Sequence, residues 1–495
     1  MMKRYGLWAL IALLVMLPGC APPALSLAER QRQIWREAGM TPAPGGTVDD
    51  AHFLRRIRFD LTGLPPTPDE IRAFLGDKDP AKRVKLIDRL LADDSFAVYQ
   101  AHLWGDELRI KSEFPINLWP NAVQLYSRYV YETVRDNVPY DKFVRDLLTA
   151  SGSNFRIPAA NFFRASADRS PKGLANAASL TFFGRPLASF SEKEQTLFVP
   201  FFTRIGFKSS KEWKEEFVFW RAPAPDAPPL AAAIPGGRPV RIAAGTDPRK
   251  VLADEVLSSG LFAEAMVRRV WRRLFGREPV GGGLDVMCRE MAARFRASGF
   301  DVRNLYREIA LSPAYGLPPG TPAQEKVFAA YPIRRLNAEQ ISDRLSALFR
   351  RPFETYSSVI PEPFTFLPPG TRAGAIGDGS ISSSFLDLMG KPPRDTGSPD
   401  ERHDRPTGEQ KLFMLNSGKL YRELRSVPNR WCGPKTPFEQ RVGELYLAAL
   451  SRPATEAELE LIRKYYAGTP RRRRGTFWAD LLWSLINSKE FVYQF

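Results

Sequence analysis

Apolar residues recur at three- and four-residue intervals along most of this chain, a spacing that is typical of helices packed on one face. In the first third, Thr67, Pro68 and Glu70 combine an N-cap residue, a proline at the first helical position and an acid three residues after the cap, which together predict a helix start. This part of the chain is therefore predicted to be all-α. The predicted helices cover residues 27–39, 49–63, 67–75, 80–91, 95–109, 120–137 and 139–150.

The helical pattern weakens between residues 166 and 246, which we expect to be an irregular middle segment. Residues 217–220 and 240–242 are short apolar runs that predict strands. Residues 222–244 are rich in proline and alanine and predict a hinge between two domains.

Helical spacing returns at residue 247 and predicts helices ending at Gly276 and covering 295–312, 337–349 and the C-terminal region. Residues 351–406 instead form a long stretch that is broken by proline and glycine and dense in charge, and such stretches are usually functional or disordered. The predicted fold class is mostly α, with two helical domains joined by the hinge, a few short strands and this charged loop.

The N-terminus has the order of a secretory leader. Lys3 and Arg4 precede an apolar run that is too short to span a bilayer, and a small residue then precedes Cys20. We expect residues 1–19 to be a lipoprotein signal peptide, Cys20 to be lipidated, and residues 20–48 to be a tether. Ordinary cleavage beside a cysteine is the alternative. The protein would then be anchored in the cell envelope on its periplasmic or extracellular face, with the outer membrane favoured because Ala21 supplies no retention signal.

The chain has 495 residues and a formal net charge of +16, and removal of the leader lowers that charge by two. Because an exported protein rarely meets nucleic acid, the basic charge points to lipid headgroups, anionic glycans or acidic envelope proteins, or simply to a solvated surface. Cys288 and Cys432 either pair or remain separate buried thiols. With three histidines and no Cys-x-x-Cys-His motif, we expect neither a metal site nor a cofactor.

Several long motifs resemble one family of proteins. They are residues 53–56 with 60–68 (DLTGLPPTP), 139–145 (PYDKFVR), 390–397 (GKPPRDTG), 405–407, 415–417, 450–453 and 485–491. Their order is similar to that of the planctomycete-type envelope proteins in which a PSCyt-type domain precedes a PSD-type domain, both of unknown function. The resemblance implies a PSCyt-like domain over residues 49–165 and a PSD-like domain over residues 247–495.

The family name implies an association with cytochromes, and members often carry a Cys/His-rich stretch in the middle of the first domain. Residues 179–220 contain neither Cys nor His, so haem binding does not carry over and electron transfer is disfavoured. Trp104, Asp106 and Arg109 match a pattern that the family has in an early helix.

Charged residues from three parts of the chain are the candidate site. Those in the long loop form either an internal ion-pair network, which we favour, or a binding site for sulfate, phosphate or uronate. The spacing of Asp106 and Arg109 favours an intrahelical pair over a substrate-facing acid. The full set is Asp106, Arg109, Arg334, Arg335, Glu339, Arg394, Asp395, Glu401, Arg402 and Arg405.

Glu339 and Asp343 lie four residues apart and so share one side of a predicted helix, where they are either paired acid–base groups or, as we favour, part of a solvated face. His102 lies four residues before Asp106 and could act with it as a general base, but no nucleophile is evident from spacing. The sequence thus favours a non-catalytic binding or scaffold module for an anionic glycan or an envelope partner. An enzyme acting on polysaccharide is the alternative, and catalysis itself remains undecided.

Overall fold

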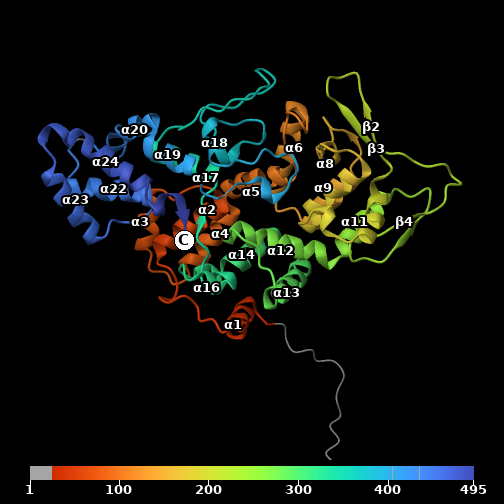
Figure 1. Ribbon diagram of the computed structural model, residues 1–495, viewed down its shortest axis with the longest axis horizontal. Coiled ribbons are helices and arrows are strands. Elements are labelled where there is room, and N and C mark those ends of the chain that lie inside the picture. Colours follow the sequence, from red (N-terminus) through yellow and green to blue (C-terminus); the bar gives the residue numbers. More distant parts are fainter. Residues whose placement is uncertain (1–24, 404, 434) are drawn as a thin grey trace, which may run out of the picture.

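The computed structural model describes residues 25–403, 405–433 and 435–495 (Figure 1). Helix accounts for 57% of the residues and strand for 5%, which confirms the mostly-α class. No described helix has both the length and the apolar character needed to cross a membrane. The predicted leader and Cys20 lie outside the described residues.

The N-terminal part confirms each predicted helix to within two residues. Thr67 and Glu70 form the predicted capping box, and Gly63 ends its helix in the left-handed conformation. The helices are α1 (Leu27–Glu37), α2 (Asp50–Thr62), α3 (Pro68–Gly76), α4 (Lys82–Ala92), α5 (Asp94–Glu107), α6 (Trp119–Arg135) and α7 (Tyr140–Thr149).

Helix α1 is packed on the body of the protein. The Trp35 indole N–H donates to the Val327 carbonyl at 3.1 Å, and Arg30 Nε donates to Glu290 at 2.8 Å. Ala43 N–H also bonds to the Ala329 carbonyl, at 2.7 Å. From residue 27 onward, the segment predicted as a tether is therefore folded against other parts of the chain.

The middle segment is more ordered than its sequence pattern predicts. The strands predicted at 217–220 and 240–242 are present. Three strands form an antiparallel sheet in the order β1-β3-β2, and β4 and β5 form a second antiparallel pair. The pattern missed α9 because this helix is buried almost all round and so lacks a polar face. The elements are β1 (Gly152–Ser153), η1 (Pro158–Ala160), α8 (Asn161–Arg164), α9 (Pro171–Phe183), η2 (Leu187–Ser189), α10 (Glu192–Phe198), η3 (Val199–Phe202), β2 (Ile205–Ser209), β3 (Glu216–Trp220), β4 (Leu230–Ala232) and β5 (Val240–Ile242).

The rest of the chain is again helical. The prediction of one helix over 295–312 is wrong, because Gly299 adopts a positive φ of 73° and separates two helices. The elements to residue 349 are α11 (Pro248–Ser258), α12 (Gly260–Phe275), α13 (Gly283–Ala297), α14 (Val302–Ala310), α15 (Pro313–Gly316), α16 (Pro322–Lys326), β6 (Arg334–Arg335) and α17 (Ala338–Phe349).

Residues 351–406 are largely irregular, in agreement with the sequence. They contain only the short elements η4 (Ala373–Ala375), α18 (Ser384–Leu388) and η5 (Pro399–Glu401). The elements that follow are α19 (Gly408–Asn416), α20 (Gly418–Leu424), α21 (Val427–Trp431), α22 (Phe438–Leu450), α23 (Glu456–Gly468), η6 (Arg471–Arg473), α24 (Arg474–Ile486), α25 (Lys489–Val492) and β7 (Tyr493–Gln494), the last of which pairs with β6.

The buried apolar residues form two cores. The first runs from Leu27 to Tyr331, with Leu447 added from the C-terminal part, and takes in Ala232 and Ile242 from the predicted hinge as well as α11–α14. The second runs from Leu336 to Phe491, with Phe59 added from α2. Figure 1 shows α20, α22, α23 and α24 of the second core at the left and the helices around α9 and α11 at the right. The predicted domain boundaries stay a prediction, but apart from Phe59 and Leu447 the change of core lies between Tyr331 and Leu336, around β6, rather than in the proline-rich segment.

Cys288 and Cys432 are both buried and both free. Of the two alternatives that the sequence left open, the disulfide is wrong and the pair of separate thiols is confirmed. Burial raises the pKa of Cys288 to about 12, so this thiol stays protonated.

Candidate functional site

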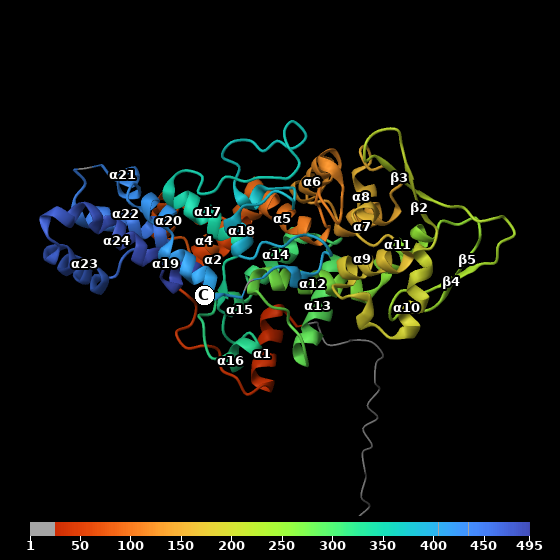
Figure 2. The same ribbon diagram turned by 45° about the horizontal axis from the view of Figure 1, so that its top comes forward.

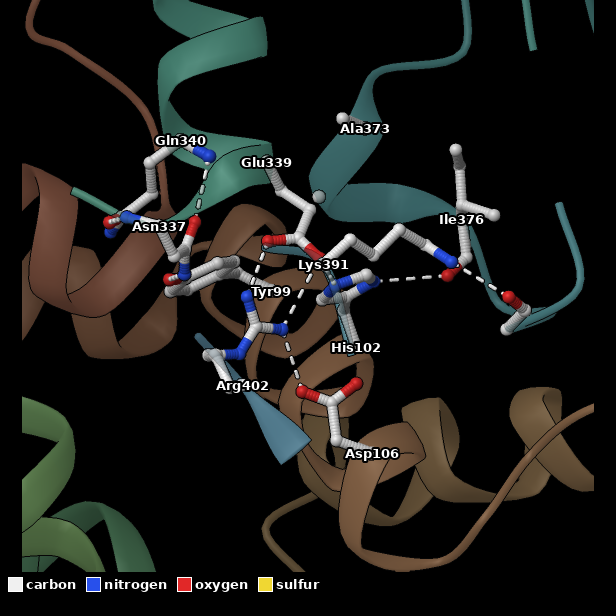
Figure 3. Close-up of polar contacts among 12 residues, drawn as sticks. Tyr99, His102, Asp106, Asn337, Glu339, Gln340, Ala373, Ile376, Lys391 and Arg402 are labelled. Atoms are coloured by element: carbon white, nitrogen blue, oxygen red, sulfur yellow. Dashed lines mark hydrogen bonds and ion pairs between the residues drawn. The ribbon is translucent and has the colours of Figure 1, made fainter. Parts of the chain in front are cut away.

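The charged loop crosses α5 and α17 and brings charged side chains together beneath it (Figure 3). His102 and Asp106 come from one face of α5, because residues four apart on a helix lie side by side. Glu339 comes from the first turn of α17, whose N-terminus is fixed by a capping box between Asn337 and Gln340. We call His102, Asp106, Glu339, Lys391, Arg394 and Arg402 the loop–helix cluster.

Arg402 joins the two acids of this cluster. Its Nη1 lies 2.6 Å from Glu339 Oε2, and its Nη2 lies 2.7 Å from Asp106 Oδ2. Burial by itself would raise the pKa of both carboxyl groups. Arg402 together with Arg394 and His102 at Asp106, and Arg402 together with His102 at Glu339, outweigh burial and hold both pKa values below their ordinary values. Both acids are therefore carboxylates near neutral pH, and the two pairs are charge-assisted hydrogen bonds.

Arg394 binds the same carboxylate from the other side and also ties down the backbone. Its Nε donates to Asp106 Oδ1 at 2.8 Å, and its other nitrogens donate to the carbonyls of Gly377 at 2.7 Å and His102 at 3.0 Å. Its side chain is only 1% exposed. Arg394 thus connects the loop to α5 and to the loop's own backbone. Its Nε and both Nη atoms donate hydrogen bonds.

His102 lies between Glu339 and the loop backbone. Its Nε2 is 3.2 Å from Glu339 Oε1, and its Nδ1 is 3.0 Å from the Ile376 carbonyl and 3.3 Å from Arg394 Nη2. A neutral ring protonated on Nε2 donates to Glu339 and accepts from Arg394. An imidazolium ring donates to both Glu339 and Ile376. The partner of His102 is thus Glu339, whereas the sequence suggested Asp106.

Lys391 places a fifth charged group in the cluster. Its Nζ donates to the Gly379 carbonyl at 2.7 Å. Burial, with a smaller repulsion from Arg394, lowers the pKa of Lys391 to about 8.

A pocket of about 360 Å³ adjoins the cluster on the side of α6. His102, Ser127, Arg128, Tyr131 and Gly377 are among the residues that line it. His102 is the cluster residue among them, and its side chain is 1% exposed.

The interpretation of Glu339 and Asp343 as a solvated helix face is wrong. The two residues are 1% and 4% exposed. Asp343 accepts hydrogen bonds from the backbone N–H groups of Ala373 at 2.7 Å and Gly374 at 2.9 Å. Burial raises its pKa to about 6, although these two donors oppose the shift. Because the loop covers α17, its acids hold the loop in place rather than face water.

The predicted intrahelical pair of Asp106 and Arg109 is also wrong. Helix α5 ends at Glu107, and Arg109 has a positive φ of 57°, which turns it away from Asp106. Its guanidinium donates instead to the carbonyls of Ala165 at 2.6 Å and Glu107 at 3.1 Å.

Arg334 and Arg335 are neighbours in sequence but serve different clusters. Arg334 pairs with the fully buried Asp60, whereas Arg335 donates to the carbonyls of Met389 and His403, both at 2.8 Å. Because β6 alternates its side chains between its two faces, adjacent arginines reach opposite sides.

The remaining candidates lie at the edge of the loop. Asp395 pairs with Lys111 at 2.6 Å, and Glu401 accepts from the backbone N–H and the hydroxyl of Thr396 at 2.7 and 2.8 Å. Arg405 is exposed. The structure therefore unites four of the ten candidates, namely Asp106, Glu339, Arg394 and Arg402, and disperses the others.

Two further buried acids were not among the candidates. Asp60 accepts from Tyr315 at 2.6 Å and Gln494 at 2.7 Å, and Glu107 pairs with Arg273 at 2.9 Å. The sequence feature that could have identified them is an acid directly beside apolar residues in a predicted helix, as Asp60 lies between Phe59 and Leu61. Among the described residues, no group of three or more His, Cys, Asp or Glu side chains is arranged to hold a metal ion.

Two family models match the chain in sequence order. The PSCyt2 model, a protein of unknown function (DUF1549), matches residues 31–181, and the PSD1 model, a protein of unknown function (DUF1553), matches residues 284–466. The first match contains α5 and the second contains α17 and the charged loop, so the loop–helix cluster is built from both. Neither a curated protein nor a solved structure matches the chain.

Proposed function

The chain carries a PSCyt2 domain followed by a PSD1 domain, and from this premise we propose that it is a lipid-anchored binding or scaffold protein of the cell envelope whose ligand is an anionic glycan. The sequence motif at the N-terminus supports the location in the cell envelope. The basic net charge of the chain supports an anionic ligand.

The observation that carries the proposal is the pairing of both Asp106 and Glu339 with Arg402. Glycoside hydrolysis by paired carboxylates needs two carboxyl groups on either side of an open sugar site, with one of them protonated. Here both carboxylates contact Arg402, Glu339 is buried and Asp106 is partly buried, and both have lowered pKa values. The cluster is thus suited to bracing two family domains against each other, and ligand contact falls to the exposed basic side chains elsewhere.

Binding is tested with the purified full-length chain and polygalacturonate as the probe. We expect saturable binding at about 0.05 M salt that weakens as the salt concentration rises, since exposed charges are screened. Neutral dextran of similar length is the control and is expected not to bind. Absence of binding to polygalacturonate at low salt would sink the proposed function.

The anchor is tested separately by growing cells with labelled palmitate. We expect the chain to be labelled and membrane-associated, and Cys20→Ala to remove the label. An unlabelled chain recovered at full length from the cytosol would rule out the anchor.

The pocket beside His102 supports a second candidate function, an enzyme that acts on polysaccharide. Glu339 would orient the imidazole, which would act as a general base on a substrate in the pocket. Release of new reducing ends from polygalacturonate, abolished by His102→Gln while binding and melting temperature persist, would favour this role over simple binding.

A further inference from the structure

The β2–β3 hairpin carries exposed aromatic and basic residues on β2, on β3 and in the loop that joins them. We call Lys208, Lys211, Trp213, Lys214 and Phe217 the hairpin platform. Trp213 is 69% exposed and Phe217 is 42% exposed, and the three lysines are exposed as well. Exposed large aromatic side chains that gather in one place commonly mark a contact surface.

The alternation of side chains along β3 creates this surface. Val218 is fully buried on the inner face, and Phe217 and Phe219 point the opposite way because successive residues of a strand face opposite sides. Lys208 pairs in register with Phe217, so a cation and an aromatic ring lie side by side on the outer face.

The carboxylates near the tip of the hairpin are held by other groups. Glu215 is 5% exposed and accepts from the hydroxyls of Ser153 and Ser210, the latter at 2.5 Å. Glu216 pairs with Arg164 and with Arg169, the latter at 3.0 Å. These bonds hold Glu215 and Glu216 in place. The exposed charged residues of the hairpin are then mainly the three lysines, and Glu212 is an exposed acid in the loop between β2 and β3.

Trp213 already contacts a cation in this structure. Lys214 Nζ lies 5.3 Å from the centre of its ring, within the range of a cation–π interaction. The ring is therefore flanked by positive charge while one of its surfaces remains open to solvent.

We propose that the hairpin platform is the binding site for the anionic glycan, an inference that rests on the proposed function. Trp213 and Phe217 would stack on the apolar faces of sugar rings, and Lys208, Lys211 and Lys214 would pair with their carboxylates. Each unit of an acidic glycan has a sugar ring and a carboxylate. The ring can pack on an aromatic side chain, and the carboxylate can pair with a lysine.

The position of the platform favours a glycan over a membrane surface. In both Figure 1 and Figure 2, β2 and β3 lie at the right-hand end of the molecule, whereas α1 lies at the bottom. A lipid on Cys20 is only seven residues from the start of α1, which is a reach of about 25 Å at most. The bilayer would therefore lie near α1, and the platform would be available to a polymer beyond it.

The test measures binding of polygalacturonate to full-length variants. We expect Trp213→Ala to raise the dissociation constant at least fivefold. The double variant Lys211→Gln, Lys214→Gln is expected to raise it and to reduce its dependence on salt. Phe366→Ala and Lys78→Gln change residues that are also exposed but lie elsewhere, and both are expected to bind within twofold of the parent protein.

The outcomes separate this inference from the proposed function. If the parent protein binds and Trp213→Ala binds equally well, the platform is not the site, although the proposed function stands. If the parent protein does not bind, both fail. If the platform variants lose binding to anionic lipid vesicles or to RNA and keep their affinity for polygalacturonate, the platform serves another partner and the inference is overturned.

Discussion

Arg394 Nε lies 2.8 Å from Asp106 Oδ1, although 288 positions separate the two residues in the chain. Asp106 lies in the PSCyt2 match and Arg394 in the PSD1 match. Together with Arg402, this contact makes the charged loop a brace between the two matched regions.

Arg402→Met should destabilise the protein by about 3–5 kcal/mol, since it removes the cation that both carboxylates share and leaves Asp106 with Arg394 and Glu339 with His102. Arg405→Met is the matched control: its side chain is exposed, and we expect a change of less than about 0.5 kcal/mol. Urea unfolding of the two variants measures the difference. A loss below about 1 kcal/mol for Arg402→Met would show that the brace is dispensable.

Gly390→Ala should destabilise the loop by at least about 2 kcal/mol. Gly390 has a positive φ of 86°, and an added Cβ would lie 2.3 Å from the backbone oxygen of His403. Gly443, in the middle of α22, has open space around it, so Gly443→Ala should stabilise the protein by about 0.5–1 kcal/mol. Thermal unfolding of both variants tests the contrast, and equal melting temperatures would contradict it.

Lys391 should make stability rise with pH in the alkaline range. Its pKa is about 8 in the folded chain and 10.5 ordinarily, so between these values the unfolded chain binds the extra proton and stability increases with pH. The full gain is at most about 3 kcal/mol. Lys391→Met should remove this rise and be more stable than the parent at pH 7. Parallel urea titrations from pH 7 to 10.5 measure the difference, and identical slopes would refute it.

Asp106 and Glu339 should make the protein sensitive to acid. Their folded pKa values lie below the ordinary values of 3.8 and 4.5, so their contribution is present above those values and is lost as pH falls through the folded pKa values. Glu339→Gln should therefore be less stable than the parent at neutral pH and should lose less stability on acidification. Melting temperatures from pH 7 to 3 provide the comparison, in which parallel curves would count against the assignment.

Both internal thiols should resist alkylation in the native protein. Cys288 and Cys432 are buried, and burial raises the pKa of each thiol. Iodoacetamide should modify neither cysteine until denaturant is added, after which both should react without any reductant. Mass spectrometry reads the result directly. A requirement for reductant would reveal a disulfide.

The helices that the sequence predicted well are amphipathic ones with local signals. The capping box of Thr67 and Glu70 and the left-handed Gly63 depend on neighbours within a few residues, so the boundaries of α2 and α3 follow from the chain itself. Helix α9 was missed because it is apolar on nearly all sides, and the break at Gly299 was missed because the apolar spacing continues past it.

For the site, residue type together with loop or helix position was enough to place Asp106, Glu339, Arg394 and Arg402 among the candidates. Their pairing was not predictable, because it depends on contacts between residues 63 to 296 positions apart in the chain. Glu339 and Asp343 show what spacing along a helix cannot reveal. Their spacing suggested a solvated face, but the loop that lies across α17 buries them.

Local information in the sequence determined the helical class and the irregular, charged character of residues 351–406, because helix periodicity and capping act over a few residues. The order of the two family domains followed from the resemblance of the long motifs. The tertiary structure alone decided which charges meet, which acids leave water, that the two cysteines stay apart, and that the outer face of the β1-β3-β2 sheet is aromatic and basic. Those features depend on distances through space, and periodicity along a chain does not encode them.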